Sequence, residues 1–472
     1  MKVFFVASEA MPYVKTGGLG DVTGSLPAAL HSVGADTSLI LPLYGTIMAK
    51  NLPLEQVMTH TLAMGGRSLT YRVLRHDQTY FIAQNELFDR DNLYNTREGD
   101  YPDNWLRFAF FARAALETVL ALGGCDVIHV HDWQAALLPV YLRFLYPERR
   151  EKTLLTIHNI AYQGLFSPEI LPDIGLPSSV FTIDGLEFYG NVNYLKGGIV
   201  SADEVNTVSP TYAREIQTEE YSFGLHGILA TRREHLTGIL NGIDYSYWDP
   251  SADGALPHMY SPSLLAGKAQ DKKSLLKETG LATEPDRPLF VIVSRLVAQK
   301  GLDLILDAFD QMMSLPLNLM VLGTGDTKIE AALVVKAAAY PGRFVFRQKF
   351  DEGLAHRMYA GSDFFLMPSR FEPCGLSQMI ALRYGSIPVV RRTGGLKDTV
   401  QDIHPRTGTG NGISFDDATP SEFLDAVRRA VRLYTDGDAF RRIQTIGMAC
   451  DFSWQASARE YLALYHSMEA TS

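Results

Sequence analysis

Several short segments of the chain combine glycine with charged side chains, a composition typical of sites that bind phosphorylated ligands. In the first of them, Lys15 comes just before Gly17 and Gly18, where an apolar run gives way to a helical pattern. Glycine lets backbone N–H groups at a helix start approach a phosphate closely, and lysine adds a positive charge. The segment predicts an anion-binding loop, with a plain glycine turn as the alternative. Its glycine spacing matches neither the dinucleotide fingerprint nor the Walker A pattern.

A second basic segment lies in the other half of the chain. Arg295 and Lys300 share one short loop, between an apolar run and a helical pattern that starts at Gly301. A guanidinium and an ammonium at such a place could stabilise a departing nucleoside diphosphate without a metal ion. The alternative interpretation is a pair of solvated surface charges.

The segment Ser369–Ser377 combines a carboxylate with a glycine turn. Glu372 suits sugar hydroxyls, and Gly375 and Leu376 are predicted to open a helix whose first N–H groups receive phosphate oxygens. Cys374 between them is not expected to be a nucleophile, because the sequence places no histidine base near it. A similar strand, glycine turn and helix pattern recurs at residues 391–396.

Histidines form the remaining candidate group. His129, His131 and Asp132 follow one apolar run, and His158 follows the next. A zinc site needs three or four convergent ligands, so we expect no metal here. His129 is expected to face the core, and for His158 a buried structural role is the alternative to a role in the site.

Two blocks of short apolar runs alternating with helical patterns must position these residues. Such runs are typical of parallel sheets covered by helices on both faces, with ligands at the carboxyl ends of the strands. The sequence therefore predicts an α/β fold of two doubly wound domains, residues 1–242 and 243–455, with a cleft between them. The apolar residues of the last segment, residues 456–472, have helical spacing and predict a helix. The sequence alone does not show on which domain this helix packs. The predicted strands cover residues 3–7, 37–41, 126–130, 153–157, 204–208, 289–294, 319–322, 344–346, 364–367 and 387–390.

Composition narrows the class of protein. The chain has 472 residues, which is too many for one core, and a formal charge of -10, which disfavours nucleic acid as a partner. Its three cysteines are far apart and predict neither disulfides nor zinc, so a reducing cytoplasm is expected. No stretch has membrane-spanning length, and the run Val3–Ala7 is too short for a signal peptide.

Taken together, the segments resemble the glycogen and starch synthase family, glycosyltransferase family 5, which has the GT-B architecture of two Rossmann-like domains. The resemblance extends from residue 15 to residue 396. The matching segments are KTGGL at Lys15, HDW at His131, HN at His158, NGID at Asn241, SRL and QKGLD around Arg295 and Lys300, SRFEPCGL at Ser369 and RRTGGL at Arg391. An ordered set of motifs is far more specific than one glycine loop.

The resemblance implies retaining transfer of glucose from ADP-glucose to the non-reducing end of an α-1,4-glucan, with release of ADP and with no metal or other cofactor. The implied catalytic residues are Glu372, His158, Lys300, Arg295 and Asp132. The implied donor-binding residues are Lys15, Gly17, Gly18, Asn241, Arg295, Lys300, Gly375 and Leu376. The implied acceptor-binding residues are Asp21, Tyr101 and Asn104.

The family also suggests finer expectations. Retention is expected by same-face attack, in which the leaving phosphate helps to deprotonate the acceptor hydroxyl; double displacement through Asp132 or Glu372 is the alternative. Phe350 stands where the family often has a tyrosine thought to stack on adenine. His158 would contact the 6-hydroxyl of the donor glucose, and the last helix would cross back to the amino-terminal domain. The competing functions are the same reaction with UDP-glucose and a catalytically silent glucan-binding protein.

Overall fold

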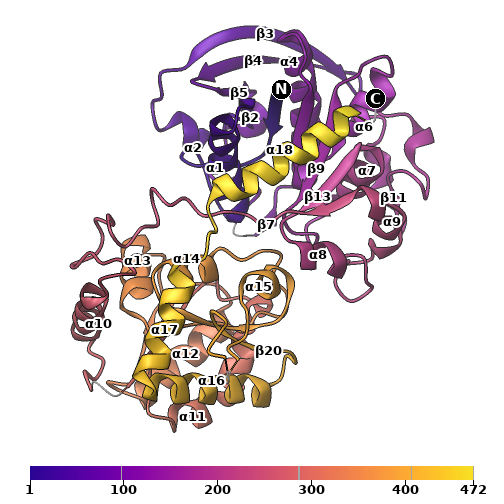
Figure 1. Ribbon diagram of the computed structural model, residues 1–472. Coiled ribbons are helices and arrows are strands. Elements are labelled where there is room, and N and C mark those ends of the chain that lie inside the picture. Colours follow the sequence, from indigo (N-terminus) through magenta and orange to yellow (C-terminus); the bar gives the residue numbers. More distant parts are fainter. Residues whose placement is uncertain (97, 285–286, 405–406, 471–472) are drawn as a thin grey trace. The chain divides into compact units, whose positions relative to one another are not determined.

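A computed structural model describes residues 1–96, 98–284, 287–404 and 407–470 (Figure 1). The chain forms two compact units. Unit 1 consists of Met1–Gly242 together with Trp454–Ser472, and unit 2 consists of Ile243–Ser453. Unit 1 is therefore built from both ends of the chain, because helix α18 (Trp454–Ala470) packs beside α1 (Gly18–Ser32) (Figure 1).

The core of unit 1 is a nine-stranded sheet. Its strand order is β14-β13-β9-β8-β1-β2-β5-β4-β3, and all neighbours run parallel except those of β4. The central strand β1 is buried from Val3 to Val6, as expected for a strand covered on both faces. The strands are β1 (Lys2–Val6), β2 (Asp36–Pro42), β3 (Glu55–Met64), β4 (Arg67–His76), β5 (Thr79–Ala83), β8 (Val127–His131), β9 (Lys152–Ile157), β13 (Glu204–Thr207) and β14 (Leu236–Gly238).

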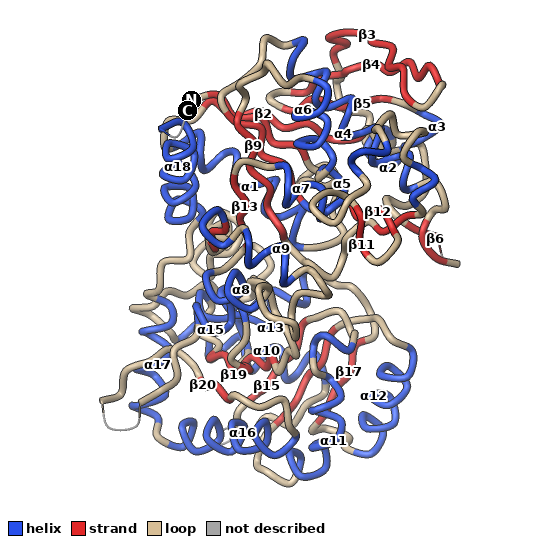
Figure 2. Tube along the Cα trace, turned by 90° about the vertical axis from the view of Figure 1, so that its right-hand side faces the viewer, coloured by secondary structure: helices blue, strands red, loops and turns tan. Residues whose placement is uncertain are grey.

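Helices and shorter strands surround this sheet (Figure 2). A small antiparallel sheet, in the order β10-β12-β11, and a two-stranded ribbon of β6 and β7 are attached to it. The remaining helices of unit 1 are α2 (Gly45–Met48), α3 (Asn85–Phe88), α4 (Asn104–Ala121), α5 (Asp132–Ala135), α6 (Leu137–Leu145), α7 (Tyr194–Ser201), α8 (Pro210–Glu215) and α9 (His226–Thr231). The short strands are β6 (Asn95–Thr96), β7 (Gly99–Asp100), β10 (Leu165–Phe166), β11 (Glu187–Phe188) and β12 (Asn191–Asn193).

The core of unit 2 is a six-stranded, fully parallel sheet. Its order is β17-β16-β15-β18-β19-β20, which is the doubly wound order of dinucleotide-binding folds. The strands are β15 (Leu289–Val293), β16 (Asn318–Leu322), β17 (Phe344–Arg347), β18 (Phe364–Met367), β19 (Ile387–Arg391) and β20 (Ile413–Phe415). The helices are α10 (Ala266–Thr279), α11 (Leu302–Met313), α12 (Thr327–Ala339), α13 (Glu352–Gly361), α14 (Ser377–Arg383), α15 (Gly394–Thr399), α16 (Pro420–Thr435) and α17 (Gly437–Met448). The predicted α/β fold of two doubly wound, Rossmann-like domains is confirmed.

Each sheet has one position where the connections leave to opposite sides, which is the usual ligand position of such folds. In unit 1 this switch point lies between β1 and β8, and in unit 2 it lies between β15 and β18. In unit 1, the Lys15 loop follows β1 and Asp132 follows β8. In unit 2, the loop of Arg295 and Lys300 follows β15 and the segment of residues 369–377 follows β18. The strand order therefore brings together segments that are more than 70 residues apart in each half of the sequence.

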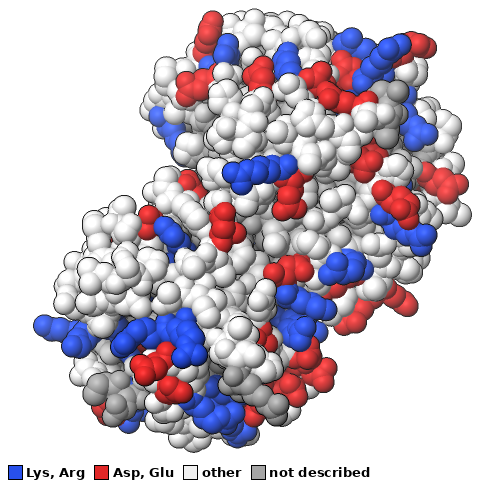
Figure 3. All heavy atoms as spheres, in the orientation of Figure 1, with Lys and Arg blue, Asp and Glu red and all other residues white. Residues whose placement is uncertain are grey.

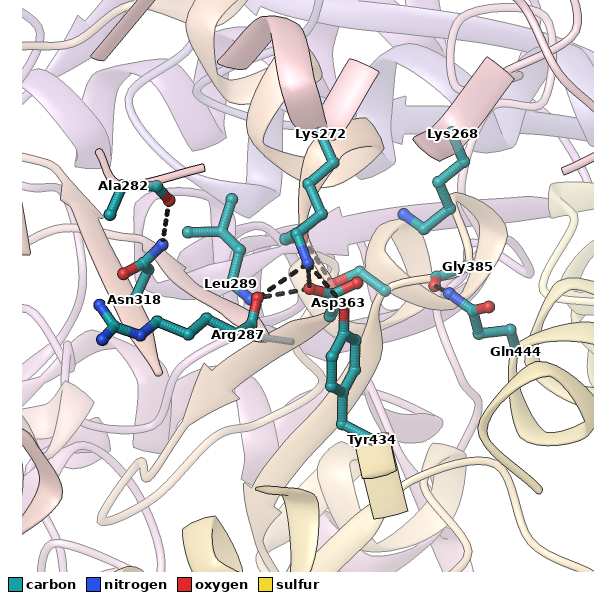
Figure 4. Close-up of polar contacts among 12 residues, drawn as sticks. Lys268, Lys272, Ala282, Arg287, Leu289, Asn318, Asp363, Gly385, Tyr434 and Gln444 are labelled. Atoms are coloured by element: carbon teal, nitrogen blue, oxygen red, sulfur yellow. Dashed lines mark hydrogen bonds and ion pairs between the residues drawn. The ribbon is translucent and has the colours of Figure 1, made fainter. Parts of the chain in front are cut away.

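A polar cluster connects α10 to the amino ends of the central strands of the unit 2 sheet (Figure 4). Lys272 forms an ion pair of 2.6 Å with Asp363, and the same carboxylate accepts the backbone N–H of Leu289 at 2.7 Å. The Lys272 ammonium also donates to the Arg287 carbonyl and to the Tyr434 hydroxyl. Because these partners lie at the amino ends of β15 and β18, the cluster supports the sheet from the side away from the candidate site.

The described helices include none that is both long and apolar enough to cross a membrane. On the face seen in Figure 3, lysine and arginine side chains lie among aspartate and glutamate side chains, and several basic side chains gather on the lower part, which is unit 2. The formal charge of the whole chain is nevertheless negative.

Candidate active site

The predicted anion-binding loop of unit 1 joins β1 to α1. Gly17 precedes the helix, and a methyl group added at Gly17 or Gly18 would meet nothing within 4 Å. The backbone is thus open at the start of a 15-residue helix, where N–H groups lack intrahelical partners. Lys15 and Asp21, expected on the diphosphate and on the glucan, form an ion pair of 2.7 Å with each other across this loop.

A buried carboxylate that the sequence reasoning missed holds the loop in place. Glu9 is 3% exposed, and it accepts hydrogen bonds from the Thr16 N–H and hydroxyl, from the Gly17 N–H at 3.4 Å, and from the Tyr94 hydroxyl. Charge-assisted bonds of this kind are among the stronger ones. The sequence feature that could have indicated this role is a single glutamate soon after the first apolar run.

Asp132 and His158 come together at the neighbouring strand ends. Asp132 adopts a left-handed backbone conformation (φ 54°), which is uncommon outside glycine, asparagine and aspartate. Its carboxylate accepts the backbone N–H of His158 at 2.7 Å. Desolvation raises the pKa of Asp132 to about 7, and hydrogen bonds from the backbone of His158 and Asn159 oppose this rise. The carboxyl group therefore titrates near neutral pH.

Three histidine rings lie next to one another, two from β8 and one that follows β9. The Nδ1 of His131 lies 3.0 Å from the Nε2 of His158. Burial lowers the pKa of His158 to about 3 and lowers that of His129 and His131 as well, so all three rings are neutral at pH 7. His129 is fully buried, which confirms its expected position in the core. Among the described residues, no group of three or more His, Cys, Asp or Glu could hold a metal ion.

The two acceptor candidates near α4 differ in their surroundings. The guanidinium groups of Arg90 and Arg107 each lie over the Tyr101 ring, 4.9 Å from its centroid. Asn104 is 3% exposed; it donates to the Tyr94 carbonyl at 2.8 Å and accepts from Arg107 at 2.7 Å. The structure thus places Asn104 where it supports the Tyr101 loop from inside.

Asn241 lies near the end of the first segment of unit 1, after β14. Its side chain is 6% exposed, and its Oδ1 is a buried acceptor without a partner within the described residues. An unpaired buried acceptor is uncommon in folded proteins, and it is consistent with a ligand-facing role.

The switch point of unit 2 brings the second basic segment to the carboxylate segment. The Lys300 ammonium lies 2.6 Å from the Glu372 carboxylate, which is 6% exposed and also accepts the Ser369 hydroxyl at 2.9 Å. Arg295 follows β15 on the same side and is exposed. The structure therefore brings Lys300 and Glu372 together, and Arg295 is exposed on the loop that leads to Lys300.

Glycines allow the loops of this switch point to interlock. A Cβ at Gly301 (φ 68°) would lie 2.0 Å from the Pro368 carbonyl oxygen, and one at Gly394 (φ 45°) would lie 1.9 Å from that of Glu372. The N–H of Gly395 donates to the Glu372 carbonyl at 3.1 Å. The glycine turn at residues 391–396, interpreted from sequence as a further phosphate or sugar loop, thus braces the loop that carries Glu372.

Gly375 and Leu376 precede α14 and do not belong to it. The helix begins at Ser377, two residues later than predicted, because Gly375 adopts a left-handed turn conformation (φ 76°). Both residues are partly exposed. Their backbone groups thus border the loop that carries Glu372.

Two family models and several curated proteins match the chain. The model described as "Starch synthase catalytic domain" matches residues 2–231, and the model described as "Glycosyl transferases group 1" matches residues 277–442. Glycogen synthase from Geotalea daltonii is 46% identical over 98% of each chain. The glycogen synthase of Anaeromyxobacter sp. is 47% identical over 100% of each chain, and that of Thermotoga maritima is 43% identical over 98%.

Solved structures agree with these matches. The catalytic domain of starch synthase IV from Arabidopsis thaliana, bound to ADP and acarbose, is similar with a TM-score of 0.91, 35% identity and 99% coverage of each chain. Sucrose-phosphate synthase from Thermosynechococcus elongatus, with a TM-score of 0.63 and 16% identity, shares the fold. The chain therefore belongs to the glycogen and starch synthase family, glycosyltransferase family 5, as its motifs indicated.

Proposed function

We propose that the chain is a glycogen synthase that transfers glucose from ADP-glucose to the non-reducing end of an α-1,4-glucan, with retention of configuration and release of ADP. The observation that carries this proposal is the contact between Lys300 and Glu372 at the switch point of unit 2, where Arg295 is exposed on the same loop as Lys300. A carboxylate suited to sugar hydroxyls thus lies next to one cation suited to a diphosphate, and a second cation lies on the same loop. A module that only bound glucan would have no use for this diphosphate site.

The chemical role of unit 2 follows from the charge that develops in the reaction. As the bond between the anomeric carbon and the phosphate oxygen breaks, negative charge grows on the ADP oxygens, and Arg295 and Lys300 stabilise it. The backbone of Gly375 and Leu376 is assigned to the same phosphates. Glu372 accepts hydrogen bonds from the donor glucose, and no metal or other cofactor takes part in the proposal.

The acceptor hydroxyl attacks from the face that the diphosphate leaves, and its proton passes to a phosphate oxygen of the departing ADP. The new bond therefore keeps the α configuration. Double displacement needs a carboxylate that becomes covalently attached to the sugar. The Glu372 carboxylate is already engaged by Lys300 and Ser369, which favours same-face attack.

Unit 1 is assigned the remaining contacts. His158 and Asp132 lie beside the reacting sugar, with His158 contacting the 6-hydroxyl. The open loop at Lys15, Gly17 and Gly18, together with Asn241, approaches the donor. Asp21, Tyr101 and Asn104 form or support the acceptor site.

The donor nucleotide is proposed to be ADP, and Phe350, 86% exposed, presents a ring on which its adenine can stack. The starch synthase IV structure, which contains ADP, supports the same choice. A cytoplasmic location belongs to the proposal, since all three cysteines are free thiols.

A donor and acceptor assay tests the proposal. The chain is mixed with glycogen and either ADP-glucose or UDP-glucose, and nucleotide release and the new glycosidic linkage are measured. We expect ADP release and a new α-1,4 linkage. Equal or better turnover of UDP-glucose would overturn the choice of donor, and glycogen binding without turnover of either donor would overturn the proposed activity.

A further inference from the structure

Two histidines of unit 1 meet through their ring nitrogens, and one of their four ring nitrogens is buried without a hydrogen-bond partner in the described part of the chain. His131, at the end of β8, is fully buried, and its Nδ1 lies 3.0 Å from the Nε2 of His158. The other nitrogen of His131, Nε2, is buried with no hydrogen-bond partner within the described residues. His158 keeps 9% of its surface exposed. The pair thus consists of a fully buried ring, His131, and a ring that is slightly exposed, His158.

The contact between the two rings allows only two arrangements of protons. Both imidazoles are neutral because burial lowers their pKa values, so each ring carries one N–H. In the first arrangement, His131 Nδ1–H donates to His158 Nε2. In the second, His158 Nε2–H donates to His131 Nδ1, and the proton of His131 is then on its unpaired Nε2.

The unpaired atom distinguishes the two arrangements. The second one leaves a buried N–H donor without an acceptor, whereas the first leaves only a bare nitrogen lone pair at the same place. Orphaned buried N–H groups are rarer than under-used acceptors. A buried donor that lacks an acceptor reduces the population of the second arrangement relative to the first by roughly five- to 150-fold. The first arrangement is therefore favoured.

The third histidine does not supply the missing partner. The His129 ring lies 4.2 Å from that of His131, but both of its nitrogens are engaged elsewhere. Thr156 donates its hydroxyl to Asn206, so it accepts from His129 Nε2–H, and His129 Nδ1 accepts from the Tyr465 hydroxyl at 2.8 Å. His131 also stacks on the Phe5 ring, which carries no nitrogen or oxygen that could accept a hydrogen bond.

We propose that His131 is a positioning residue, whose Nδ1–H holds His158 in the tautomer that carries its proton on Nδ1. His158 then presents an N–H donor, and not an acceptor, to a hydroxyl oxygen of the glucosyl group. This inference rests on the proposed function, because it takes His158 to contact the donor sugar. It deepens that function by giving the direction of one hydrogen bond and the residue that sets it.

The tautomer can be observed without any activity. The full-length protein is labelled with 15N in its histidine rings, and long-range proton–nitrogen correlations are recorded, with His158→Gln used to assign the signals. We expect the His158 pattern of a protonated Nδ1 and an unprotonated Nε2. The reverse pattern would overturn the inference.

Substitutions of His131 give a second test. Asparagine places an amide N–H close to the position of Nδ1, whereas leucine has a similar size and no donor. We expect H131L to lower kcat with ADP-glucose by about 10- to 100-fold with a much smaller change in KM, and H131N to recover most of this loss. Equal loss in both variants, with melting temperatures unchanged, would contradict a role for the Nδ1–H donor.

A donor analogue links the effect to the sugar. With ADP-6-deoxyglucose, which lacks the 6-hydroxyl, the wild type and H131N should show the same fold-loss of kcat/KM, and H131L a clearly smaller one. An equal loss in all three proteins would refute the assigned contact. If the wild type transferred no glucose at all, the proposed function would fail, while the labelled rings would still report the tautomer.

Discussion

At the scale of single residues, the contact between Lys300 and Glu372 leads to the most direct prediction. Lys300→Ala removes a cation that matters most when negative charge develops on the leaving diphosphate, so kcat should fall by about 10²- to 10³-fold. The KM for ADP-glucose should change far less. Steady-state kinetics with glycogen as acceptor measures both constants.

The matched control for Lys300 is a surface ion pair of the same unit. Lys336 lies 2.6 Å from Asp310, whose side chain is 68% exposed, and exposed pairs contribute little. Lys336→Ala should leave kcat and KM unchanged. A kcat of Lys300→Ala equal to that of this control would exclude the charge role of Lys300.

Asp132 gives a pH-dependent prediction. Its pKa is raised to about 7 from the ordinary 3.8, so the folded state binds more protons than the unfolded state between these values, and this contribution to stability falls as pH rises from 4 to 7. Asp132→Asn keeps an oxygen acceptor for the His158 N–H and tolerates the left-handed backbone. The stability of Asp132→Asn minus that of the wild type should therefore be larger at pH 8 than at pH 5. Urea titrations at both values check this.

Asp132→Ala is the contrasting variant at the same position. It loses the acceptor, and alanine tolerates the left-handed backbone at φ 54° less well than aspartate or asparagine, so it should lose about 2 to 4 kcal/mol at either pH. A difference between Asn and wild type that did not depend on pH would show that the carboxyl group titrates as in water.

The sequence allowed the positions of residues at strand ends to be predicted, but not the buried side chains that support them. Lys300 and Glu372 were predicted near a common edge because each follows a strand of a doubly wound sheet, and they lie 2.6 Å apart. The support of the Lys15 loop by Glu9 was not predicted, since burial of a carboxylate depends on how the chain folds over it. The inward position of Asn104 has the same cause.

At the scale of elements, the close approach of Gly394 to the Glu372 carbonyl gives a stability prediction. Gly394→Ala would force the loop that carries Glu372 to move, because its Cβ would overlap a backbone oxygen at 1.9 Å. We expect a loss of about 2 to 4 kcal/mol in the free energy of unfolding, together with reduced kcat. Urea unfolding and kinetics of the purified variant measure the two effects.

Gly437→Ala is the matched glycine control, since a methyl group at Gly437, in the first turn of α17, would meet nothing within 4 Å. Its stability should stay within about 0.5 kcal/mol of wild type. Equal stability of the two variants would show that the tight contact at Gly394 is readily relieved.

Helix α10 carries a buried lysine that predicts a second pH effect. Lys268 is 6% exposed and donates to the Ala360 carbonyl at 2.8 Å, and desolvation lowers its pKa to about 7 from 10.5 (Figure 4 shows its side chain). The nearby carboxylates of Asp271 and Asp363 oppose this shift, and the charge of Lys272 adds to it. The unfolded state binds more protons between pH 7 and 10.5, so stability rises with pH across this window.

Lys268→Met should consequently gain stability relative to wild type at pH 7, and this relative gain should shrink by pH 9. Urea titrations at the two values measure it, with Lys277→Met, exposed on the same helix, as the control. A pH-independent difference for Lys268→Met would mean that the lysine stays charged throughout.

Regular elements with strong periodicity were predictable, and pairing between distant segments was not. The predicted strands 364–367 and 387–390 coincide with β18 and nearly with β19, because short apolar runs between turns have few alternatives. The hairpin of β3 and β4 was missed, although Gly65 and Gly66 (φ 58° and 73°) form the turn expected of it. Strand β3 is largely exposed and β4 is only partly buried, so their apolar pattern is weak.

At the scale of the whole molecule, unit 1 depends on the last segment of the chain. Helix α18 buries Trp454, Tyr461 and Tyr465 in unit 1, and the Tyr465 hydroxyl bonds to His129 in the core. Deletion of residues 454–472 should reduce hydrogen-exchange protection in β1, β8 and β9, and leave protection in β15–β20 unchanged. Mass spectrometry of exchanged peptides reports the two units separately.

Two single substitutions on α18 refine this prediction. Tyr465→Phe removes only the hydroxyl that meets His129 and should cost about 1 to 2 kcal/mol, whereas Arg459→Ala, on the exposed side of the helix, should have almost no effect. Loss of protection in unit 2 after the deletion would contradict the independence of the two cores.

The return of α18 has a consequence for synthesis on the ribosome. The segment up to Gly242 emerges first, but its sheet lacks the covering helix until the about 210 residues of unit 2 have followed. At about 5 to 20 residues per second, that interval is on the order of 10 to 40 seconds. The amino-terminal half thus waits through the whole synthesis of unit 2 before α18 can pack on it, and during this interval it exposes apolar surface that the finished chain buries.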